Sequence, residues 1–421
     1  MAIKGSGSPM ETVDEYFDML IKSRFNEMFG DLKQESPWES YKLSELFDLT
    51  MGKTPSRDTP KYWSNGVYPW VSISDITSSN GVINDTKEKI SEDAVAESGI
   101  KQIDAGTVLM SFKLSIGKTA LTKFPLYTNE AIVAFVPKKS EVINNSFLQE
   151  WIKEKNWNEG SNKAVKGATL NKATLKEMRI HIPPIRLQNQ FADFVGQVNK
   201  SKRTYKRIFE SFDNLVKSRF IEMFECIDLS AQKPDWISIG EVGTILTGST
   251  PKTNEPSYWN GDLKWIAPAE LTSESFIIND TERKITEEGR KSCSLNLLEP
   301  GVVLLSSRAP IGKVAIVGSE MYCNQGFKNI KCGPKLNNVF LFVLLKNNTE
   351  YLNSLGRGAT FKEISAKIVE NIRIPVPPIE DQNRFVDFFM QVDKSKFEVV
   401  QSLLRLKSKY MHTETPSERT D

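Results

Sequence analysis

The chain has few of the residues that catalysis and metal binding most often require. Its 421 residues include only two histidines, His181 and His412, and four cysteines without a CxxC spacing. His181 lies in a strand-like run beside two prolines, and His412 lies in a polar tail. Neither has a serine, cysteine or metal-ligand partner at a useful spacing. We therefore expect no catalytic residue and no metal site in this chain, and reduced thiols as in an intracellular protein.

Long apolar runs and a strong net charge are also lacking. No stretch approaches the 20 or so apolar residues that would span a bilayer, so we expect no membrane partner and a cytoplasmic location. The first residues, MAIKGSGSP, are small and polar, and we interpret them as an expression remnant outside the fold. With 55 basic and 53 acidic residues the net charge is +2, so any basic surface must be local.

Two motifs of enzymes are incomplete or absent in this sequence. The segment LSIGKT resembles the end of a phosphate-binding loop, but the required glycine five positions before the Gly-Lys pair is replaced by Phe112. The second copy of this segment has Ser307 at that position and Val314 in place of the hydroxyl. No Asn-Pro-Pro or Asp-Pro-Pro segment of the kind found in adenine methyltransferases is present.

What the sequence does contain is a long internal repeat. GKTPSRDTPKYW begins at Gly52 and GSTPKTNEPSYW at Gly248, with six identical positions of twelve. INDT, the Gly-Lys segment, the Gly-Ala-Thr segment and the IPPI or VPPI segment followed by QN-x-F recur in the same order, and all the offsets, including that of the opening phrase, lie between 191 and 196. This period is far longer than a solenoid unit, so each copy is a whole domain with a helix.

The composition of each copy predicts an α+β domain with an irregular sheet. TVLMSF, AIVAFV and MRIHIP in the first copy, and VVLLSS, KVAIVG and IRIPVP in the second, have the short apolar character of strands between turn residues. SFLQEWIKEKN and NVFLFVLLKNN are typical of helices. We therefore predict two pseudo-twofold-related α/β domains.

A long helix is predicted between the two domains. Large or aliphatic residues recur at alternating steps of three and four along it, with Ser201 in one of these positions, which predicts a coiled-coil seam of Phe191, Phe194, Val198, Tyr205, Ile208, Phe212 and Leu215. The C-terminal run repeats the first half of this helix and the N-terminal run repeats its second half. We infer that the chain ends meet and pack antiparallel on the central helix. Its 38 residues from 187 to 224 would be about 57 Å long, or roughly 17 base pairs of B-DNA.

These patterns predict seven segments. They are a disordered start (1–12), an N-terminal half-helix (13–33), a first domain (36–182), a central coiled-coil helix (183–229), a second domain (234–376), a C-terminal coil helix (377–411) and a disordered tail (412–421).

The order of these motifs, duplicated along nearly the whole chain, resembles that of specificity subunits of type I restriction–modification systems. The resemblance implies two target-recognition domains that each read one half of a bipartite double-stranded DNA target. It also implies a non-catalytic chain without cofactors of its own, which binds two modification subunits that methylate adenine with S-adenosylmethionine. Restriction subunits that use ATP and Mg to cut DNA can join such an assembly. A scaffold that binds only proteins and a stand-alone DNA-binding repressor are the alternatives.

The two copies suggest which residues contact DNA. Residues that differ between equivalent positions are candidates for reading bases, whereas shared residues hold the fold or contact phosphates. For the opening loop the candidates are Lys53, Thr54, Ser56, Arg57 and Asp58 in the first domain, and Ser249, Thr250, Lys252, Thr253 and Asn254 in the second. The threonines would bind either phosphate or their own backbone. Gly52, Pro55, Trp63 and their counterparts are expected to be structural.

Two further candidate sets follow in each copy. Around the Gly-Lys segment they are Lys113, Ser115 and Lys118, against Ser307, Arg308 and Lys313; around the Gly-Ala-Thr segment they are Lys163, Lys166 and Thr169, against Arg357, Thr360 and Lys362. Arg308 suits guanine, and Gln325 suits adenine or a structural hydrogen bond. Asp75 and Glu270 are repeat-equivalent acids for which base reading and a capping role remain equally open.

Overall fold

The computed structural model describes residues 9–30, 36–113, 115–138, 141–157, 162–164, 167–357 and 362–410. Contacts divide the chain into two compact units. The first unit comprises residues 16–203, and the second comprises residues 204–421 together with 1–15. Each unit contains one copy of the repeat, and each is described here by itself.

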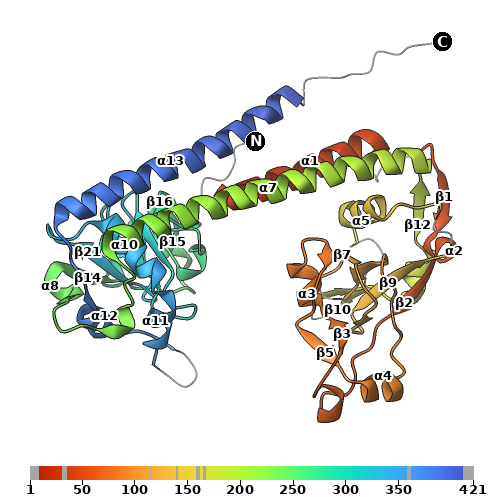
Figure 1. Ribbon diagram of the computed structural model, residues 1–421, viewed down its shortest axis with the longest axis horizontal. Coiled ribbons are helices and arrows are strands. Elements are labelled where there is room, and N and C mark those ends of the chain that lie inside the picture. Colours follow the sequence, from red (N-terminus) through yellow and green to blue (C-terminus); the bar gives the residue numbers. More distant parts are fainter. Residues whose placement is uncertain are drawn as a thin grey trace. The chain divides into compact units, whose positions relative to one another are not determined.

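The first unit is built on a five-stranded sheet with the order β2-β9-β6-β7-β4 (Figure 1). Its strands are β2 (Phe47–Met51), β4 (Val82–Ile83), β6 (Val108–Ser111), β7 (Thr119–Thr122) and β9 (Ile132–Pro137). A three-stranded sheet, β5-β3-β8, joins β3 (Tyr68–Val71), β5 (Glu88–Ile90) and β8 (Tyr127–Thr128). The described residues of this unit also form two strand pairs: β1 (Glu39–Lys42) with β12 (Arg179–Ile182), and β10 (Asn162–Ala164) with β11 (Gly167–Thr169).

The second unit repeats this topology. Its five-stranded sheet, β14-β21-β18-β19-β16, contains β14 (Gly243–Thr247), β16 (Ile277–Ile278), β18 (Val303–Leu305), β19 (Val314–Val317) and β21 (Lys328–Cys332). Its three-stranded sheet, β17-β15-β20, contains β15 (Trp259–Ile266), β17 (Arg283–Ile285) and β20 (Tyr322–Cys323), and β13 (Ile237–Ser238) pairs with β22 (Arg373–Ile374). The predicted α+β class, with two repeated sheet sets and a long helix, is confirmed.

Short helices cover these sheets. In the first unit they are α2 (Leu43–Leu46), α3 (Ile73–Ser78), α4 (Glu92–Ser98), α5 (Asn145–Glu154), α6 (Lys172–Glu177) and the 3-10 turn η1 (Pro60–Tyr62). In the second they are α8 (Ile239–Val242), α9 (Glu287–Lys291), α10 (Asn338–Asn347), α11 (Thr349–Ser354), α12 (Ala366–Asn371) and the 3-10 turns η2 (Leu229–Ala231), η3 (Pro256–Tyr258) and η4 (Pro268–Glu270). The two predicted helical runs are therefore α5 and α10.

The central strands are buried on both faces because two apolar layers enclose them. Val303 and Leu305 of β18 pack in one core cluster with α10, whereas the intervening Leu304 packs in a separate cluster with Phe327 and Leu298. This alternation follows from the two-residue period of a strand. It explains why the strand sequences read as continuous apolar runs rather than as alternating polar and apolar residues.

The described residues include three long helices: α1 (Pro9–Phe29), α7 (Ile185–Phe224) and α13 (Ile379–Tyr410). α1 begins at Pro9, whereas the sequence predicted a start at residue 13; proline suits a first helical position because the N–H that it lacks would have no helical partner there. α7 ends where Glu225 adopts a φ of +66°. No helix within the described ranges is long and apolar enough to cross a membrane.

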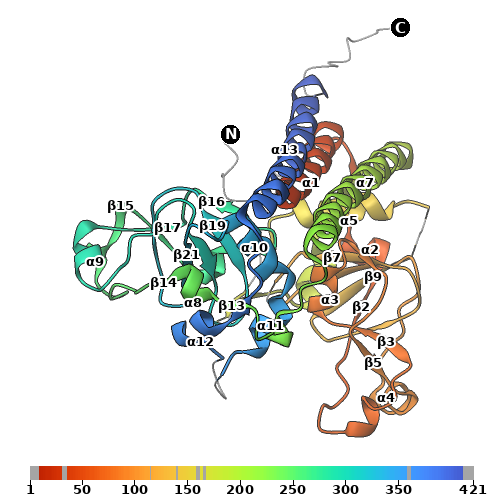
Figure 2. The ribbon, with the colours of Figure 1, turned by 60° about the vertical axis from the view of Figure 1, so that its left-hand side comes forward.

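In the first unit, α1 runs antiparallel to the first half of α7 (Figure 2). Phe25 of α1 contacts Phe191 near the start of α7, with ring centroids 5.6 Å apart, whereas Asp18, earlier in α1, pairs with Lys202, later in α7, at 3.2 Å. In the second unit α13 packs against the second half of α7 in the same way, through the equivalent pairs Phe220–Phe385 (5.2 Å) and Asp213–Lys396 (2.5 Å).

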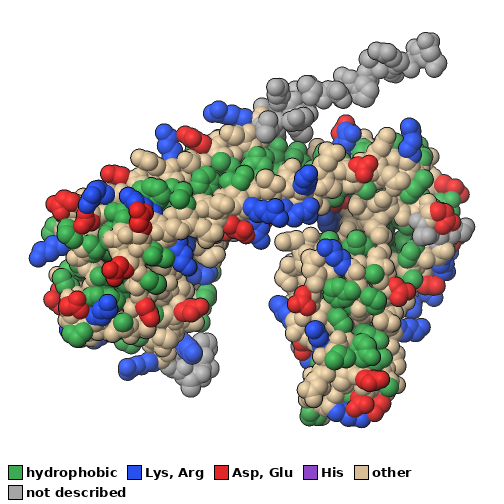
Figure 3. Space-filling view, in the orientation of Figure 1, with side chains coloured by type: hydrophobic (Ala, Val, Ile, Leu, Met, Phe, Trp, Pro, Cys, Tyr) green, Lys and Arg blue, Asp and Glu red, His purple; other side chains and the backbone are tan. Residues whose placement is uncertain are grey.

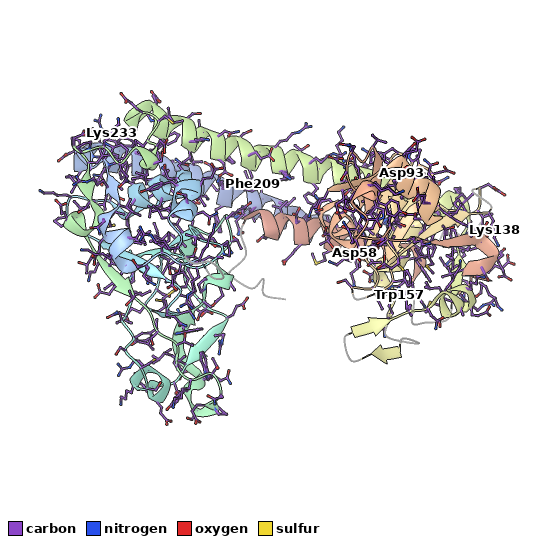
Figure 4. All side chains as sticks on the ribbon, turned by 90° about the horizontal axis from the view of Figure 1, so that it is seen from below. Asp58, Asp93, Lys138, Trp157, Phe209 and Lys233 are labelled. Atoms are coloured by element: carbon purple, nitrogen blue, oxygen red, sulfur yellow. The ribbon has the colours of Figure 1, made fainter. Side chains whose placement is uncertain are left out.

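The apolar stripe of α7 differs from the predicted seam. Phe191 and Val198 are buried as predicted, but Ile208 is 37% exposed and Leu215 is 48% exposed. Phe209, labelled in Figure 4, is buried instead. Apolar residues stand side by side at 208–209 and 215–216, so two heptad phases fit this part of the sequence, and the prediction took the wrong one.

The QN-x-F motif fastens each long helix to the domain before it. The side chain of Gln188 is fully buried, accepts from the backbone N–H of Asn144 and donates to the carbonyls of Val142 and Pro183. Gln382 makes the three equivalent hydrogen bonds at the start of α13, with Asn337, Lys335 and Pro377. The direction of each helix is therefore set by buried backbone groups of its own domain.

Candidate nucleic-acid interface

The opening loop of each domain passes unusually close to a neighbouring strand end. A Cβ atom added at Gly52 would lie 2.2 Å from the carbonyl oxygens of Thr128 and Asn129, and one at Gly248 would lie 2.1 Å from that of Cys323. Only glycine allows this approach, because every other residue carries a Cβ atom. The expected structural role of the two glycines thus has a steric reason.

Two tryptophans hold the backbone of this loop. In the first domain the indole N–H of Trp63 donates to the carbonyl of Ser56 at 3.1 Å, and that of Trp70 donates to the carbonyl of Lys53 at 3.2 Å. The second domain repeats both bonds, from Trp259 to Lys252 (3.1 Å) and from Trp265 to Ser249 (3.0 Å). The shared tryptophans therefore fix the backbone of residues whose side chains differ between the domains.

Most of these variable side chains are exposed. The exposed residues are Lys53, Ser56, Arg57 and Asp58 in the first domain, with Asp58 labelled in Figure 4, and Lys252, Thr253 and Asn254 in the second. Ser249 is half-buried. Lys53 donates from Nζ to the carbonyl of Ser98 at 2.5 Å, so its ammonium group already has one partner within the domain.

Arg57 has several partners within its own domain. Its two terminal nitrogens lie 2.5 and 2.9 Å from the carboxylate of Glu88, and its guanidinium carbon lies 3.6 Å from the ring centroid of Trp63. The hydrogen bonds from Arg57 hold the pKa of the Glu88 carboxyl below its ordinary value, and the same bonds raise the pKa of Arg57. The guanidinium group thus also holds the loop against β5.

Thr54 and Thr250 each contact a side chain at equivalent positions of the repeat, Glu130 in the first domain and Gln325 in the second. The hydroxyl of Thr54 donates to the carboxylate of Glu130, and that of Thr250 donates to the amide oxygen of Gln325. Burial favours a raised pKa for Glu130, but hydrogen bonds, first of all from Thr54, outweigh it and lower the pKa. Each domain therefore presents a threonine beside one variable acceptor, a carboxylate in the first domain and an amide in the second.

The Gly-Lys segment forms a tight hairpin loop in both domains. Gly117 and Gly312 each have a φ of +89°, and the Oγ atoms of Ser111 and Ser306 accept from the N–H groups of Lys118 and Lys313. Lys118 donates from Nζ to Thr77, and Lys313 donates to the carbonyl of Leu271. These lysines, which both domains share, therefore link the hairpin to the end of α3 in the first domain and to the end of η4 in the second.

The hairpin presents Lys113 and Ser115 in the first domain and Arg308 in the second. Ser115 and Arg308 are exposed, and Lys113 is half-buried. Ser307 is fully buried, and its hydroxyl accepts from Lys328 at 3.3 Å. The prediction that Ser307 contacts DNA needs correction, because its side chain is not accessible to solvent in this fold.

The third candidate set is only partly described. Lys166 and Thr360 lie outside the described residues, and for Lys163 and Thr169 the structure gives the backbone, which belongs to the β10–β11 hairpin. Arg357 and Lys362 are exposed. The backbone N–H of Arg357 donates to the carbonyl of Glu363 at 3.1 Å, and the reverse bond measures 3.0 Å.

The two repeat-equivalent acids serve as caps. The carboxylate of Asp75 accepts from the N–H groups of Ser72 and Lys87 at 2.8 and 3.1 Å, and Glu270 accepts from Ala267 and Glu282 at 2.8 and 2.7 Å. Burial raises the pKa of Glu270. Of the two roles that the sequence left open, the structure shows the capping role.

Basic side chains also gather along the middle of α7, where the sequence reads KSKRTYKR (Figure 3).

Among the described residues, three buried or half-buried charged groups were not suggested by the sequence: Lys328 and Glu363 near the candidate residues, and Glu150 of α5. Over the described ranges, no group of three histidine, cysteine or acidic side chains is arranged to hold a metal ion. Burial raises the pKa of the thiols of Cys323 and Cys332 to about 12.

Comparison with known proteins assigns these duplicated domains to a family. The model of the type I restriction modification DNA specificity domain matches residues 35–208 and again residues 235–405. The MjaIX specificity subunit of Methanocaldococcus jannaschii is 37% identical over 184 residues, which are 42% of this chain and 43% of that protein. The chain thus spans less than half of that relative. The putative MjaX specificity subunit of the same organism is 25% identical over 391 residues, which are 86% of this chain and 88% of that protein.

Solved structures from this family align along most of the chain. One chain from a type I R-M system covers 89% of this chain and 95% of its own length, at 19% identity and a TM-score of 0.49. The two matched ranges contain both copies of the repeat, with their Trp-held loops, the first part of α7 and most of α13. The chain therefore belongs to the family of type I restriction–modification DNA specificity subunits, and it contains the family's specificity domain twice.

Proposed function

We propose that each domain reads one half of a bipartite double-stranded DNA target. The observation that carries this proposal is the opening loop, whose backbone is held by the same glycine and tryptophan contacts in both domains while the exposed side chains differ. A shared backbone presents side chains in the same geometry, and different side chains recognise different bases. Glu130 against Gln325 and Lys113 against Arg308 add two more differences beside that loop.

The long helix α7 would set the separation of the two half-sites. Its 40 residues correspond to about 60 Å at 1.5 Å per residue. That length matches roughly 17 or 18 base pairs of B-DNA. The basic residues in the middle of α7 would lower the cost of placing an unread DNA spacer nearby, so binding should weaken as salt rises.

Two modification subunits are the proposed protein partners, and restriction subunits can join them. Apolar side chains remain exposed on the helices of the second unit: Ile208 and Leu215 on α7, and Met390 and Phe397 on α13, with Phe397 61% exposed. Exposed apolar side chains at heptad spacing suit the docking of further helices. Adenine methylation with S-adenosylmethionine and ATP-dependent cleavage are assigned to the partners, and this chain supplies sequence specificity.

A loop exchange tests this function. Random duplex libraries are selected with the chain and its modification subunit, and the wild type should enrich a split sequence. A variant in which residues 53 and 56–58 are replaced by those at 249 and 252–254 should change the preference in one half-site and leave the other unchanged. The reciprocal exchange, in which residues 249 and 252–254 are replaced by those at 53 and 56–58, is the matched comparison and should change only the other half-site.

Each contrary outcome selects another function. Failure to enrich any split sequence, together with duplex binding that does not depend on salt, contradicts DNA reading and favours a scaffold that binds only proteins. Tight specific binding by the chain alone favours a stand-alone repressor. A loop exchange that alters both half-sites equally contradicts the assignment of one half-site to each domain.

A further inference from the structure

The second domain contains a carboxylate held between two cations. One oxygen of Glu363 lies 3.2 Å from Nζ of Lys328, and the other accepts from Nε of Arg308 at 3.0 Å. Arg308 lies in the hairpin loop after β18, and Lys328 begins β21. The three side chains therefore form a chain of charges from the sheet to the exposed hairpin.

Lys328 is a fixed member of this cluster. Its side chain is 10% exposed, and its ammonium group has three acceptors: the carboxylate of Glu363, the hydroxyl of Ser307 at 3.3 Å and the carbonyl of Gln325 at 3.1 Å. An ammonium group has three N–H donors, so all of them are used. Lys328 is thus unsuited to contact DNA itself, and its charge is available only to Glu363.

Glu363 is fixed through its backbone as well as its side chain. It exchanges two backbone hydrogen bonds with Arg357, and the next residue, Ile364, donates to the carbonyl of Ser307 at 2.9 Å. Burial favours a raised pKa for Glu363, but the hydrogen bonds from Arg308 and Lys328 outweigh it and lower the pKa. The carboxylate is therefore ionised at neutral pH and accepts from both cations.

The two terminal nitrogens of Arg308 are available to bind a ligand. Its side chain is 48% exposed, and only Nε is bound to Glu363. Within the described part of the chain, its two terminal nitrogens have no hydrogen-bond partner. Two parallel N–H donors match O6 and N7 of guanine in the major groove, and holding Nε reduces the entropy lost when they bind.

We propose that Glu363, supported by Lys328, is a positioning residue that holds Arg308 for a bidentate contact with a guanine in the half-site of the second domain. This assignment rests on the proposed function, and it names the base class that one residue reads.

The first domain lacks this arrangement. Its equivalent residues are Lys113 for Arg308 and Val133 for Lys328. The segment from Gly167 to Leu170 is three residues shorter than the equivalent segment from Gly358 to Ile364, so Glu363 has no counterpart. Lysine binds as a point charge rather than as a planar fork, so we expect the first domain to lack this guanine contact.

Selection on random duplex libraries, with the modification subunit present, tests the proposal. Arg308→Lys keeps the charge but removes the fork, and it should lower discrimination at one guanine of the second half-site roughly ten- to a hundredfold. Glu363→Gln and Lys328→Met should weaken the preference at the same guanine by a smaller factor. Lys331→Met is the matched control, because it removes an exposed ion pair with Glu299 from the same strand, and it should leave every position unchanged.

A base analogue tests whether Arg308 contacts N7 of the guanine. Replacing that guanine by 7-deazaguanine, which lacks the N7 acceptor, should weaken binding by the wild type and have little further effect on Arg308→Lys. The first half-site serves as the folding control for every variant and should keep its preference.

Three results would overturn the proposal. They are an unchanged base preference in Arg308→Lys, a second half-site without guanine, and an equal loss at all positions of that half-site in Glu363→Gln and Lys328→Met, which would indicate general destabilisation. If the wild type enriches no split sequence, the proposed function itself fails, and this assignment fails with it.

Discussion

Arg57 and Arg283 occupy the same place over equivalent tryptophans, although they do not align in the repeat. The guanidinium carbon of Arg57 lies 3.6 Å from the ring centroid of Trp63, and that of Arg283 lies 3.6 Å from that of Trp259. Arg57 comes from the opening loop, whereas Arg283 comes from β17 at the position that Glu88 occupies in the first domain. Both domains thus have an arginine stacked on the equivalent tryptophan, but the arginine comes from a different position of the repeat in each.

This relationship predicts a compensated pair of substitutions. Glu88→Arg alone places a second cation beside Arg57 and removes its carboxylate partner, and Arg57→Thr alone leaves Glu88 unpaired beside the indoles. The double variant copies the second domain, so its arginine at position 88 should stack on Trp63. We expect the two effects on the free energy of unfolding to be non-additive by about 1 kcal/mol, in favour of the double variant.

Urea unfolding of the full chain, carried out on the wild type, both single variants and the double variant, measures this coupling. Arg290→Ala is a suitable control, because it removes an exposed arginine of the second domain that pairs with Glu287 at 2.8 Å. Additive single effects would contradict the idea that the two arginines are interchangeable.

This arginine also shows the limits of a sequence repeat. The strands and the helices α5 and α10 followed from local patterns, because apolar runs between turn residues specify them. Aligning the copies, however, pairs Arg57 with Thr253 and suggests a free base-reading residue. An alignment of the two copies compares residues at equivalent positions. It therefore does not detect a contact that a loop residue makes in one domain and a strand residue makes in the other.

The predicted helix seam and one predicted contact residue, Ser307, differ from the structure for related reasons. Ile208 and Phe209 are adjacent apolar residues, and only packing against α7's partners decides which of them is buried. Ser307 aligned with Phe112 as a variable residue, but both are buried. Glu363 lies in a segment without a counterpart in the first domain, so a comparison of the copies gave no signal for it.

The opening glycines should be intolerant of any side chain. Gly52→Ala would place a Cβ atom 2.2 Å from the carbonyl oxygens of Thr128 and Asn129, which is too close without moving the loop. We expect a loss of about 1–3 kcal/mol in the free energy of unfolding and a weaker preference in the half-site of the first domain. Thermal unfolding and library selection measure the two effects.

Gly196→Ala is the matched control for this substitution. Gly196 lies within α7, and a Cβ atom there would have no atom within 4 Å. Alanine should therefore stabilise the helix by roughly 0.5–1 kcal/mol. A Gly52→Ala variant as stable as the wild type would contradict the close approach seen at this loop.

The buried glutamines at the start of the long helices should contribute more to the free energy of unfolding than their exposed neighbours. Gln382→Ala leaves the N–H of Asn337 and the carbonyls of Lys335 and Pro377 without their buried partner. Since each unsatisfied buried group costs about 1–3 kcal/mol, we expect a loss of at least about 2 kcal/mol in the free energy of unfolding.

Asn383→Ala provides the comparison at the adjacent residue. It removes one exposed hydrogen bond, from Asn337, and should cost well under about 1 kcal/mol. Urea unfolding with limited proteolysis near residue 380 measures both variants. Equal losses for Gln382→Ala and Asn383→Ala would mean that the glutamine does not fasten the helix.

Glu150 should make the stability of the first domain depend on pH. Its side chain in α5 is 5% exposed, with Lys153 at 3.1 Å and the charges of Glu154 and Asp18 nearby. Burial raises its pKa above the ordinary value of 4.5, and Lys153 only partly opposes this. Between 4.5 and the raised pKa the folded state binds more protons than the unfolded state, so the free energy of unfolding falls as pH rises through that window.

Glu150→Gln removes this titration and should raise the melting temperature at pH 7. The gain should shrink as pH falls towards 4.5, because the wild-type carboxyl is then protonated in the folded state. Glu154→Gln is the control on the same helix, since it removes the ion pair with Lys22 at 2.7 Å and should give no gain at pH 7. A Glu150→Gln variant that is less stable than the wild type at pH 7 would show that the ionised carboxylate is stabilising, through Lys153, rather than penalised by burial.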